Sequence, residues 1–172
     1  MPAPSTAPLS APRFIVAPTG GSTPQSWTFA ELSNISLEVE PHEYIFTDNV
    51  GSIVHTKQYG KTKPPGVTLK KPMDSDRSLW LWHLAVQAGN DAAKMDVTLQ
   101  VWNAGSPGVQ PIGQPYFQWT LWHAWPSKIE LAGMKAGGTE TGVLTVTFAC
   151  DLIQILTANG QPTAGAATGS PF

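Results

Sequence analysis

The stretch "PYFQWTLWHAWPSKIEL", residues 115–131, alternates in its first half between two sets of side chains, as a β-strand does. One face would carry Phe117, Trp119, Leu121 and His123, and the other Gln118, Thr120 and Trp122. Pro126 has no backbone N–H, so we expect it to interrupt the hydrogen-bond ladder and "SKIEL" to begin a new strand. The stretch therefore predicts a β fold in which two strands meet at a proline.

Three further segments show the same period of two. In "ISLEVE", residues 35–40, the apolar face is Ile35, Leu37 and Val39. In "KMDVTLQVWN", residues 94–103, it is Met95, Val97, Leu99 and Val101. In "VLTVTFACDLIQI", residues 143–155, it is Leu144, Val146, Phe148, Cys150 and Leu152. We expect these faces to form one shared core.

A helix is predicted over residues 76–88. Ser75 or Asp76 can cap its start, and Gly89 followed by Asn90 can end it. On a helical period Leu79, Trp82 and Val86 share the face toward the chain's own sheet. Trp80, Leu81 and Leu84 make most of the remaining surface apolar as well, so this second face should be covered by another subunit or by the chain's own tails.

The triplet Leu-Trp-His occurs twice, at residues 81–83 in this helix and at residues 121–123 in the strand. Because the two copies belong to different kinds of element, their side chains should point in unrelated directions. A shared site is not needed to explain the repeat.

Residues 41–66 contain two short β-like runs around "DNVG", a typical turn sequence. They predict a long hairpin that is poor in core residues. Such an arm needs an external partner.

Length and composition favour one domain in 172 residues, with residues 27–156 folded and the Pro-, Ala-, Ser- and Thr-rich residues 1–26 and 157–172 flexible. "RFIV" at 13–16 is a possible docking point of the N-terminal segment. The net charge of -2 offers no basic patch for sequence-specific nucleic-acid binding. No Sec signal and no bilayer-spanning segment are expected, and Cys150, as the single cysteine, allows no intrachain disulfide.

The sequence does not predict catalysis, a cofactor or a metal site. The four histidines lack metal-ligand spacing, and no nucleophile motif or phosphate-binding loop is present. The alternative to a structural protein is a Trp-rich β-sandwich that binds carbohydrate, with Trp102, Trp122 and Trp125 as a stacking platform. A helix that needs burial on both sides argues against that alternative.

The order of motifs resembles the contractile-phage tail-tube family, which includes the inner tubes of contractile injection systems. The resemblance rests on "PPGVTLKKPMDSDRSLWLW", "DVTLQVWN", "WTLWHAWPSKIEL" and the closing "VLTVTFACDLIQI", and it covers residues 27–156. "KKPM" stands where relatives tend to have Lys-Arg-Gly.

The resemblance implies a mainly β fold, a β-barrel or sandwich of two packed antiparallel sheets with one flanking helix and a long hairpin arm. It implies six copies per ring, with rings stacked into a hollow tube that sheath contraction expels through a target envelope. The implied partners are other copies of the chain, the sheath protein, baseplate, spike and tube-initiator proteins, and a tape-measure protein or effector cargo in the lumen. Assembly would occur in the bacterial cytoplasm, before the subunit becomes part of a phage-tail-like particle.

Roles follow from this resemblance as hypotheses. The inter-subunit helix face would be Trp80, Leu81 and Leu84. The ring-stacking arm would use Tyr44, Phe46, Asp48, Asn49, Gly51, Ile53, His55 and Gln58. Lumen-facing candidates are Glu38, Glu40, Asp96, Thr98, Gln100, Thr145 and Thr147. Trp125, Pro126 and Lys128 would form a structural corner.

Overall fold

The computed structural model describes residues 12–19, 26–102, 115–139 and 141–156. The strands are β1 (Arg13–Pro18), β2 (Trp27–Phe29), β3 (Glu31–Ser36), β4 (Val39–Thr47), β5 (Ile53–Thr62), β6 (Gly66–Pro72), β7 (Met95–Trp102), β8 (Phe117–Leu131), β9 (Val143–Ala149) and β10 (Leu152–Leu156). Helix α1 spans Ser78–Gln87, and a short 3-10 turn, η1, spans Asp91–Ala93.

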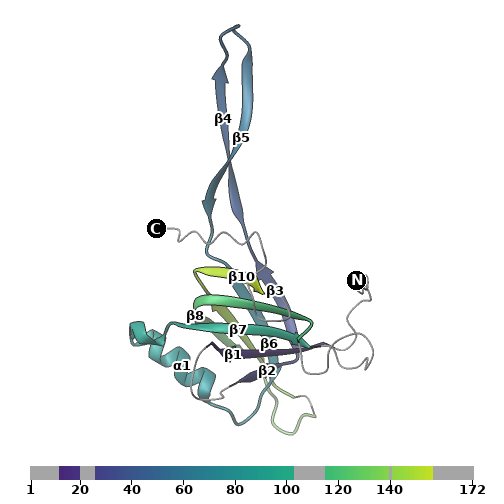
Figure 1. Cartoon of the computed structure of the whole chain (residues 1–172). Helices are drawn as coiled ribbons and strands as arrows, with labels where there is room; N and C mark the ends of the chain where they lie inside the picture. The colour runs from purple at the N-terminus through teal and green to yellow at the C-terminus, as the bar shows by residue number, and fades with distance from the viewer. Residues whose placement is uncertain (1–11, 20–25, 103–114, 140, 157–172) are drawn as a thin grey trace, which may run out of the picture.

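Strand β8 belongs to both halves of the sheet, and at the other side the consecutive strands β2 and β3 join the two halves into a barrel (Figure 1). The first half of β8 pairs with β7 and β10, and its second half pairs with β9. At the other side β2 pairs with β1 while β3 pairs with β6, and the intervening Ala30 N–H donates to the Lys70 carbonyl at 2.9 Å. The predicted mainly β barrel with one flanking helix and a hairpin arm is therefore confirmed.

The core is formed where the inner faces of the two halves meet. Val97, Leu99, Val146 and Phe148 are completely buried, as their alternation predicted. Helix α1 adds Trp82, which stacks on Trp27 with ring centroids 5.4 Å apart. Stacked pairs of this kind contribute about 1 kcal/mol beyond the area they bury.

Strand β1 comes from the segment that was expected to lie outside the folded domain. Its residues 13–18 pair with β2 on one side and with β7 on the other, and Phe14 and Val16 are buried. The barrel therefore includes residues that precede the predicted start at Trp27.

The predicted alternation along β8 is wrong beyond Leu121, because a bulge shifts it. Leu121 pairs with Val97 and Ala124 with Met95, so Trp122 and His123 together oppose Asp96. Both are exposed, and His123 adopts φ 49°, a left-handed conformation that His tolerates better than most residues. Its N–H donates to the Asp96 carboxylate at 2.8 Å.

The predicted break at Pro126 is also wrong, since β8 continues to Leu131. A second register shift, between Pro126 and Lys128, accommodates the missing proline donor. Ser127 is the extra residue, and its hydroxyl donates to the Thr147 carbonyl at 3.0 Å.

Three apolar residues placed in the core are exposed. Leu37 and Val39 lie beyond the end of β3, where no second layer covers them, and they are 64% and 49% exposed. The closing strand bends at Cys150 and Asp151, so Leu152 begins a separate strand, β10, and is exposed.

Helix α1 begins two residues later than expected. Its N-cap residue is Arg77, which makes no side-chain capping bond, and neither Ser75 nor Asp76 occupies that position. Asp76 still supplies an acceptor, because its carboxylate accepts the Ser78 N–H at 2.9 Å.

Candidate assembly surfaces

The arm is the two-stranded sheet β4–β5, and it leaves one end of the barrel (Figure 1). It continues β3 and β6, since the Lys63 N–H donates to the Glu38 carbonyl at 2.9 Å between the two pairs. Nine residues of β4 extend it by about 30 Å. An isolated two-stranded sheet of this length has no second layer of its own, so its apolar side chains need a partner.

Apolar side chains are exposed on both faces of the arm. Tyr44 and Phe46 share one face and lie with ring centroids 6.3 Å apart, while Ile45 and Ile53 lie on the other face. All four are exposed. Of the other predicted arm residues, His55 pairs with Ile45 in register and Gln58 with His42.

The tip of the arm is a small ordered turn. The Asp48 carboxylate accepts the N–H groups of Val50 and Ser52, each at 2.9 Å, and Gly51 adopts φ 85°. These bonds explain why Asp48 and Gly51 suit the turn. They hold Val50, which is 88% exposed, at the far end of the arm.

The base of the arm carries a cluster of charges. Lys63 Nζ lies 2.8 Å from a Glu38 carboxylate oxygen and 3.2 Å from one of Glu40. The hydrogen bond to Glu38 raises the pKa of Lys63 most, and the one to Glu40 raises it further. Gly60 faces Glu40 so closely that a Cβ there would collide with the Glu40 carbonyl, so the crossing of the two strands requires glycine.

Helix α1 lies against β8 with one apolar face buried and one exposed. Leu79 and Trp82 are buried, whereas Trp80, Leu81 and Leu84 are 37%, 63% and 55% exposed. The exposed three are the predicted inter-subunit face.

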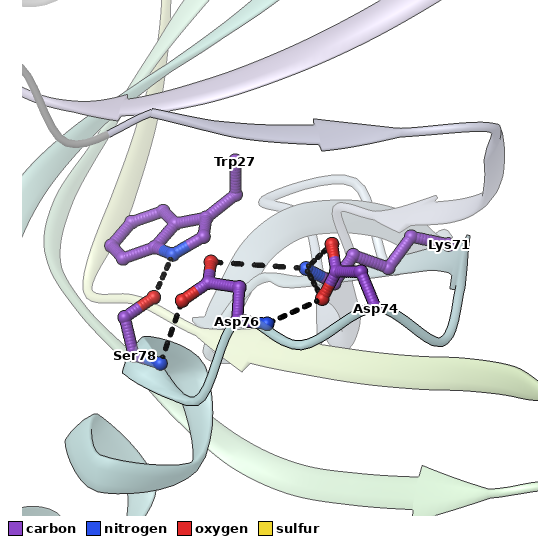
Figure 2. A network of polar contacts seen from close by, with 5 residues as sticks. All are labelled: Trp27, Lys71, Asp74, Asp76 and Ser78. Carbon is purple, nitrogen blue, oxygen red and sulfur yellow. Dashed lines mark hydrogen bonds and ion pairs between the residues drawn. The ribbon is translucent and has the colours of Figure 1, made fainter.

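A polar network fixes the start of this helix (Figure 2). Lys71, which is 3% exposed, lies 2.9 Å from Asp74 and 4.0 Å from Asp76. Asp76 accepts the Ser78 N–H, and the Ser78 hydroxyl accepts the Trp27 indole N–H at 2.6 Å. The pKa of Asp76 is lowered, and the hydrogen bond from the Ser78 backbone is the largest cause.

The seven lumen candidates lie in four places. Val97 and Leu99 face the core, so Thr98 and Gln100 lie on the opposite face of the β7 half, where Thr98 is nonetheless buried and its hydroxyl lies 2.8 Å from that of Thr19. Val146 and Phe148 face the same core from the opposite side, so Thr145 and Thr147 point out of the β9 half. Asp96 is at the β8 bulge, and Glu38 and Glu40 are at the base of the arm. One continuous lumen surface cannot contain both outward faces.

In the predicted structural corner, Pro126 is buried, Trp125 is half-buried and Lys128 is exposed. Pro126 is buried, and its carbonyl lies 2.8 Å from His83 Nδ1 on the helix. The Lys94 ammonium nitrogen lies over the Trp125 ring, 5.7 Å from the ring centroid. Lys128 Nζ lies 2.7 Å from a Glu130 carboxylate oxygen. The His83 of one Leu-Trp-His triplet therefore touches the strand that carries the other.

Sequence reasoning missed a group of exposed apolar side chains at the end of the barrel opposite the arm. The group consists of Met73, Leu131, Met134 and Val143, which we call the distal patch. The signal was available in "LAGMKAGG", residues 131–138, where a methionine stands in a glycine-rich connection.

The tryptophans proposed as a sugar platform do not lie together. Trp102 ends β7, whereas Trp125 contacts Lys94, which precedes β7, so they are separated by the strand's length of about 25 Å. Among residues 12–19, 26–102, 115–139 and 141–156, no three His, Cys, Asp or Glu side chains are grouped closely enough to hold a metal ion. No helix in the same ranges is long and apolar enough to cross a membrane.

The same fold occurs in solved structures of contractile injection systems. One is the anti-feeding prophage cap, a tube-terminating cap, with a TM-score of 0.66, 23% identity, and 89% of this chain and 93% of that chain covered. Others are a PVC sheath/tube terminator (TM-score 0.66, 21% identity, 88% and 98% covered) and a PVC sheath-tube complex (TM-score 0.63, 21% identity, 88% and 93% covered). A comparison with curated protein sequences finds no match.

The barrel, flanking helix and arm thus define the fold that these components of contractile injection systems share. The family model of the T4-like virus tail tube protein gp19 matches residues 10–154, and the chain belongs to that family. The predicted resemblance is confirmed.

Proposed function

We propose that the chain is the repeating subunit of an inner tube, in which six copies form a ring and rings stack into a hollow tube. The main support for ring stacking is the arm, which extends beyond the barrel and has exposed apolar side chains on both faces. A contact that joins unlike surfaces of successive copies continues into a filament.

Within a ring, the exposed helix face of Trp80, Leu81 and Leu84 packs against a neighbouring copy. Burying these three side chains removes an exposed apolar surface from water. The outer edges of β3 and of the second half of β8, which have no partner strand in the described residues, are further contacts around the ring.

The lumen lies on the outward face of β6 and β9. The arm continues β3 and β6, so if the arm points to the next ring, these strands run along the tube and their edges face around the ring (Figure 1). The outward face carries Thr145 and Thr147 together with Thr68 and Lys70. Thr98 and Gln100, on the other half, then point away from the lumen.

The wider assembly follows the family. A contractile sheath surrounds the tube, a baseplate with spike and initiator proteins starts it, and a tape-measure protein or effector cargo fills it; contraction drives the tube through a target envelope. Solved structures with this fold are described as a sheath-tube complex, a baseplate and a terminating cap, which supports these partners. Assembly takes place in the bacterial cytoplasm. The tube domain is residues 27–156 with β1 added, and the predicted C-terminal tail, residues 157–172, lies outside the described residues.

Negative-stain microscopy of the purified chain tests the function, with rings or tubes expected. In a variant that replaces residues 48–52 with Asn-Gly, we expect rings that do not stack, because the tip contact is gone while Thr47 and Ile53 stay paired across a favourable two-residue turn. Long tubes from this variant would contradict the role of the arm. A chain that stays monomeric at all concentrations would contradict the tube itself.

A further inference from the structure

Two rows of polar side chains cross the outward face of β3, β6, β9 and the second half of β8. The strand register sets Glu31, Lys70, Thr145 and Glu130 side by side in one row, and Asn34, Thr68, Thr147 and Lys128 in the next. Leu69 and Val146 lie between the two rows in sequence and are completely buried, so alternation places both rows on the surface that faces away from the core. We call these eight residues the polar rows.

The charges of the polar rows cancel one another. Lys70 Nζ lies 2.8 Å from a Glu31 carboxylate oxygen, and Lys128 Nζ lies 2.7 Å from one of Glu130. The hydrogen bond from Lys70, followed by one from the Ser33 hydroxyl, lowers the pKa of Glu31. With two lysines and two glutamates, the polar rows present no net charge, whether or not each exposed pair is closed at a given moment.

Hydroxyl groups on this face bond to the sheet itself. Thr68 Oγ1 lies 3.2 Å from Thr147 Oγ1 across β6 and β9. The Ser127 hydroxyl, next to the polar rows, donates to the Thr147 carbonyl at 3.0 Å. A group that already has a partner gains little from a passing molecule, because the new hydrogen bond replaces an existing one.

The formal charge of the chain lies elsewhere. The whole chain has a net charge of -2, and the polar rows contribute nothing to it. Nucleic acid is retained where uncompensated lysines or arginines displace the counterions of its phosphates. Neither the polar rows nor the rest of the chain, taken as a sum, offers such an excess of positive charge.

We propose that the polar rows form a charge-neutral wall of the lumen, which does not retain nucleic acid and suits the passage of a polypeptide of mixed charge. This inference rests on the proposed tube and its lumen face, and it adds the chemistry of the wall. Repetition around a ring and along the tube multiplies a net charge of zero, so the wall stays neutral at any length. A polypeptide that carries both signs of charge meets no region of uniform sign to hold it.

Protection of DNA from nuclease by assembled tubes tests the neutral wall. Tubes are assembled at low salt with dye-labelled single-stranded DNA, treated with nuclease and sedimented, and wild-type tubes should retain no intact DNA. The variant Glu31→Gln/Glu130→Gln leaves Lys70 and Lys128 without carboxylates and gives each copy two uncompensated positive charges on this face. We expect it to protect about ten-fold more DNA than the wild type, and to release that DNA at high salt.

Asp91→Asn/Asp151→Asn is the matched control. It changes the net charge by the same amount, but both carboxylates lie outside the polar rows, where Asp91 pairs with Lys94 and Asp151 with His123. It should protect no more DNA than the wild type. Microscopy of each preparation shows whether tubes have formed, and the single variants Glu31→Gln and Glu130→Gln should each protect an intermediate amount.

Protected DNA in wild-type tubes would overturn the neutral wall. Equal protection by the glutamate variant and the control, or none by any glutamate variant that forms tubes, would show that the polar rows do not line the lumen. A dye-labelled unfolded polypeptide of near-zero net charge should sediment equally with wild-type and Glu31→Gln/Glu130→Gln tubes, and a difference as large as that for DNA would contradict its free passage. Absence of tubes in the unmodified chain would overturn the proposed function itself, and microscopy separates that result from the others.

Discussion

At the scale of single residues, the least expected feature is a buried lysine. Val67 and Leu69 occupy the core-facing row of β6, and Lys71 continues that row to the barrel end, where its ammonium group meets Asp74 and Asp76. A buried charge is tolerated because carboxylates compensate it. The ion pairs also order the connection from β6 into α1 (Figure 2).

Asp74→Ala should destabilise the fold by about 2 kcal/mol, because it leaves the buried Lys71 with the more distant Asp76 alone. Urea unfolding followed by tryptophan fluorescence measures this change. Asp91→Ala is the matched control, since Asp91 makes the same three-residue spacing with Lys94 but is 97% exposed. It should cost less than about 0.5 kcal/mol, and equal losses would show that burial of Lys71 is unimportant.

Asp76 should make stability depend on acid pH. Its folded pKa is lowered, so its contribution is present above the unfolded value of about 4 and is lost as pH falls through the lower folded pKa. The urea midpoint of the wild type should therefore fall more steeply below pH 4 than that of Asp76→Asn. The amide retains an acceptor for the Ser78 N–H. Identical pH profiles would rule out this role.

At the scale of elements, α1 has one face buried against the barrel and one face exposed. Leu79 and Trp82 hold it to the barrel, whereas Leu84 is 55% exposed and is not part of the core cluster that the described residues form. The two faces can therefore be changed separately.

Leu84→Glu should block ring formation and leave the monomer folded, because it places a charge in the proposed contact without touching the core. Gel filtration gives the assembly state, and circular dichroism gives the fold. Gln87→Glu, which adds the same charge at the exposed end of the helix, should assemble normally. Rings from Leu84→Glu would exclude the helix face from the interface.

Sequence patterns predicted the strands that run without a bulge and have one face toward the core and one away from it. The core-facing rows of β7 and β9 follow a period of two as expected, although Thr98 on the other face of β7 is buried as well. In β8 the same rule failed at His123, since one inserted residue exchanges the faces, and nothing local to "LWH" announces a bulge. Its partner Asp96 lies in another strand, so the bulge is a tertiary effect.

The candidate site was predicted in part. The turn chemistry of "DNVG" located the arm, and the doubly apolar helix located its exposed face. The distal patch depends on register, because the pairing of β6 with β9 sets Pro72 opposite Val143 and brings the Met73 N–H to the Gly142 carbonyl. The prediction also grouped lumen candidates that lie on two opposite faces. Alternation alone does not show which half of a barrel a strand belongs to.

At the scale of the whole molecule, the two outward faces should differ in access once tubes form. In assembled tubes, Thr145→Cys should be protected from a maleimide attached to a large polymer but should react with a small maleimide. Gln100→Cys, on the opposite half of the barrel, should react with both. Both variants should label fully after the tubes are dissociated, and the reverse pattern would place the lumen on the β7 face.

The continuity of the arm with β3 and β6 also determines how the molecule carries load. A push along the arm passes down the covalent chain into these two strands, and their hydrogen bonds to each other and to β9 run across the direction of force. Such bonds are loaded together in shear and cannot be unzipped one at a time. In the proposed tube, axial thrust is therefore shared by the β3–β6–β9 half of the barrel before any single bond must break.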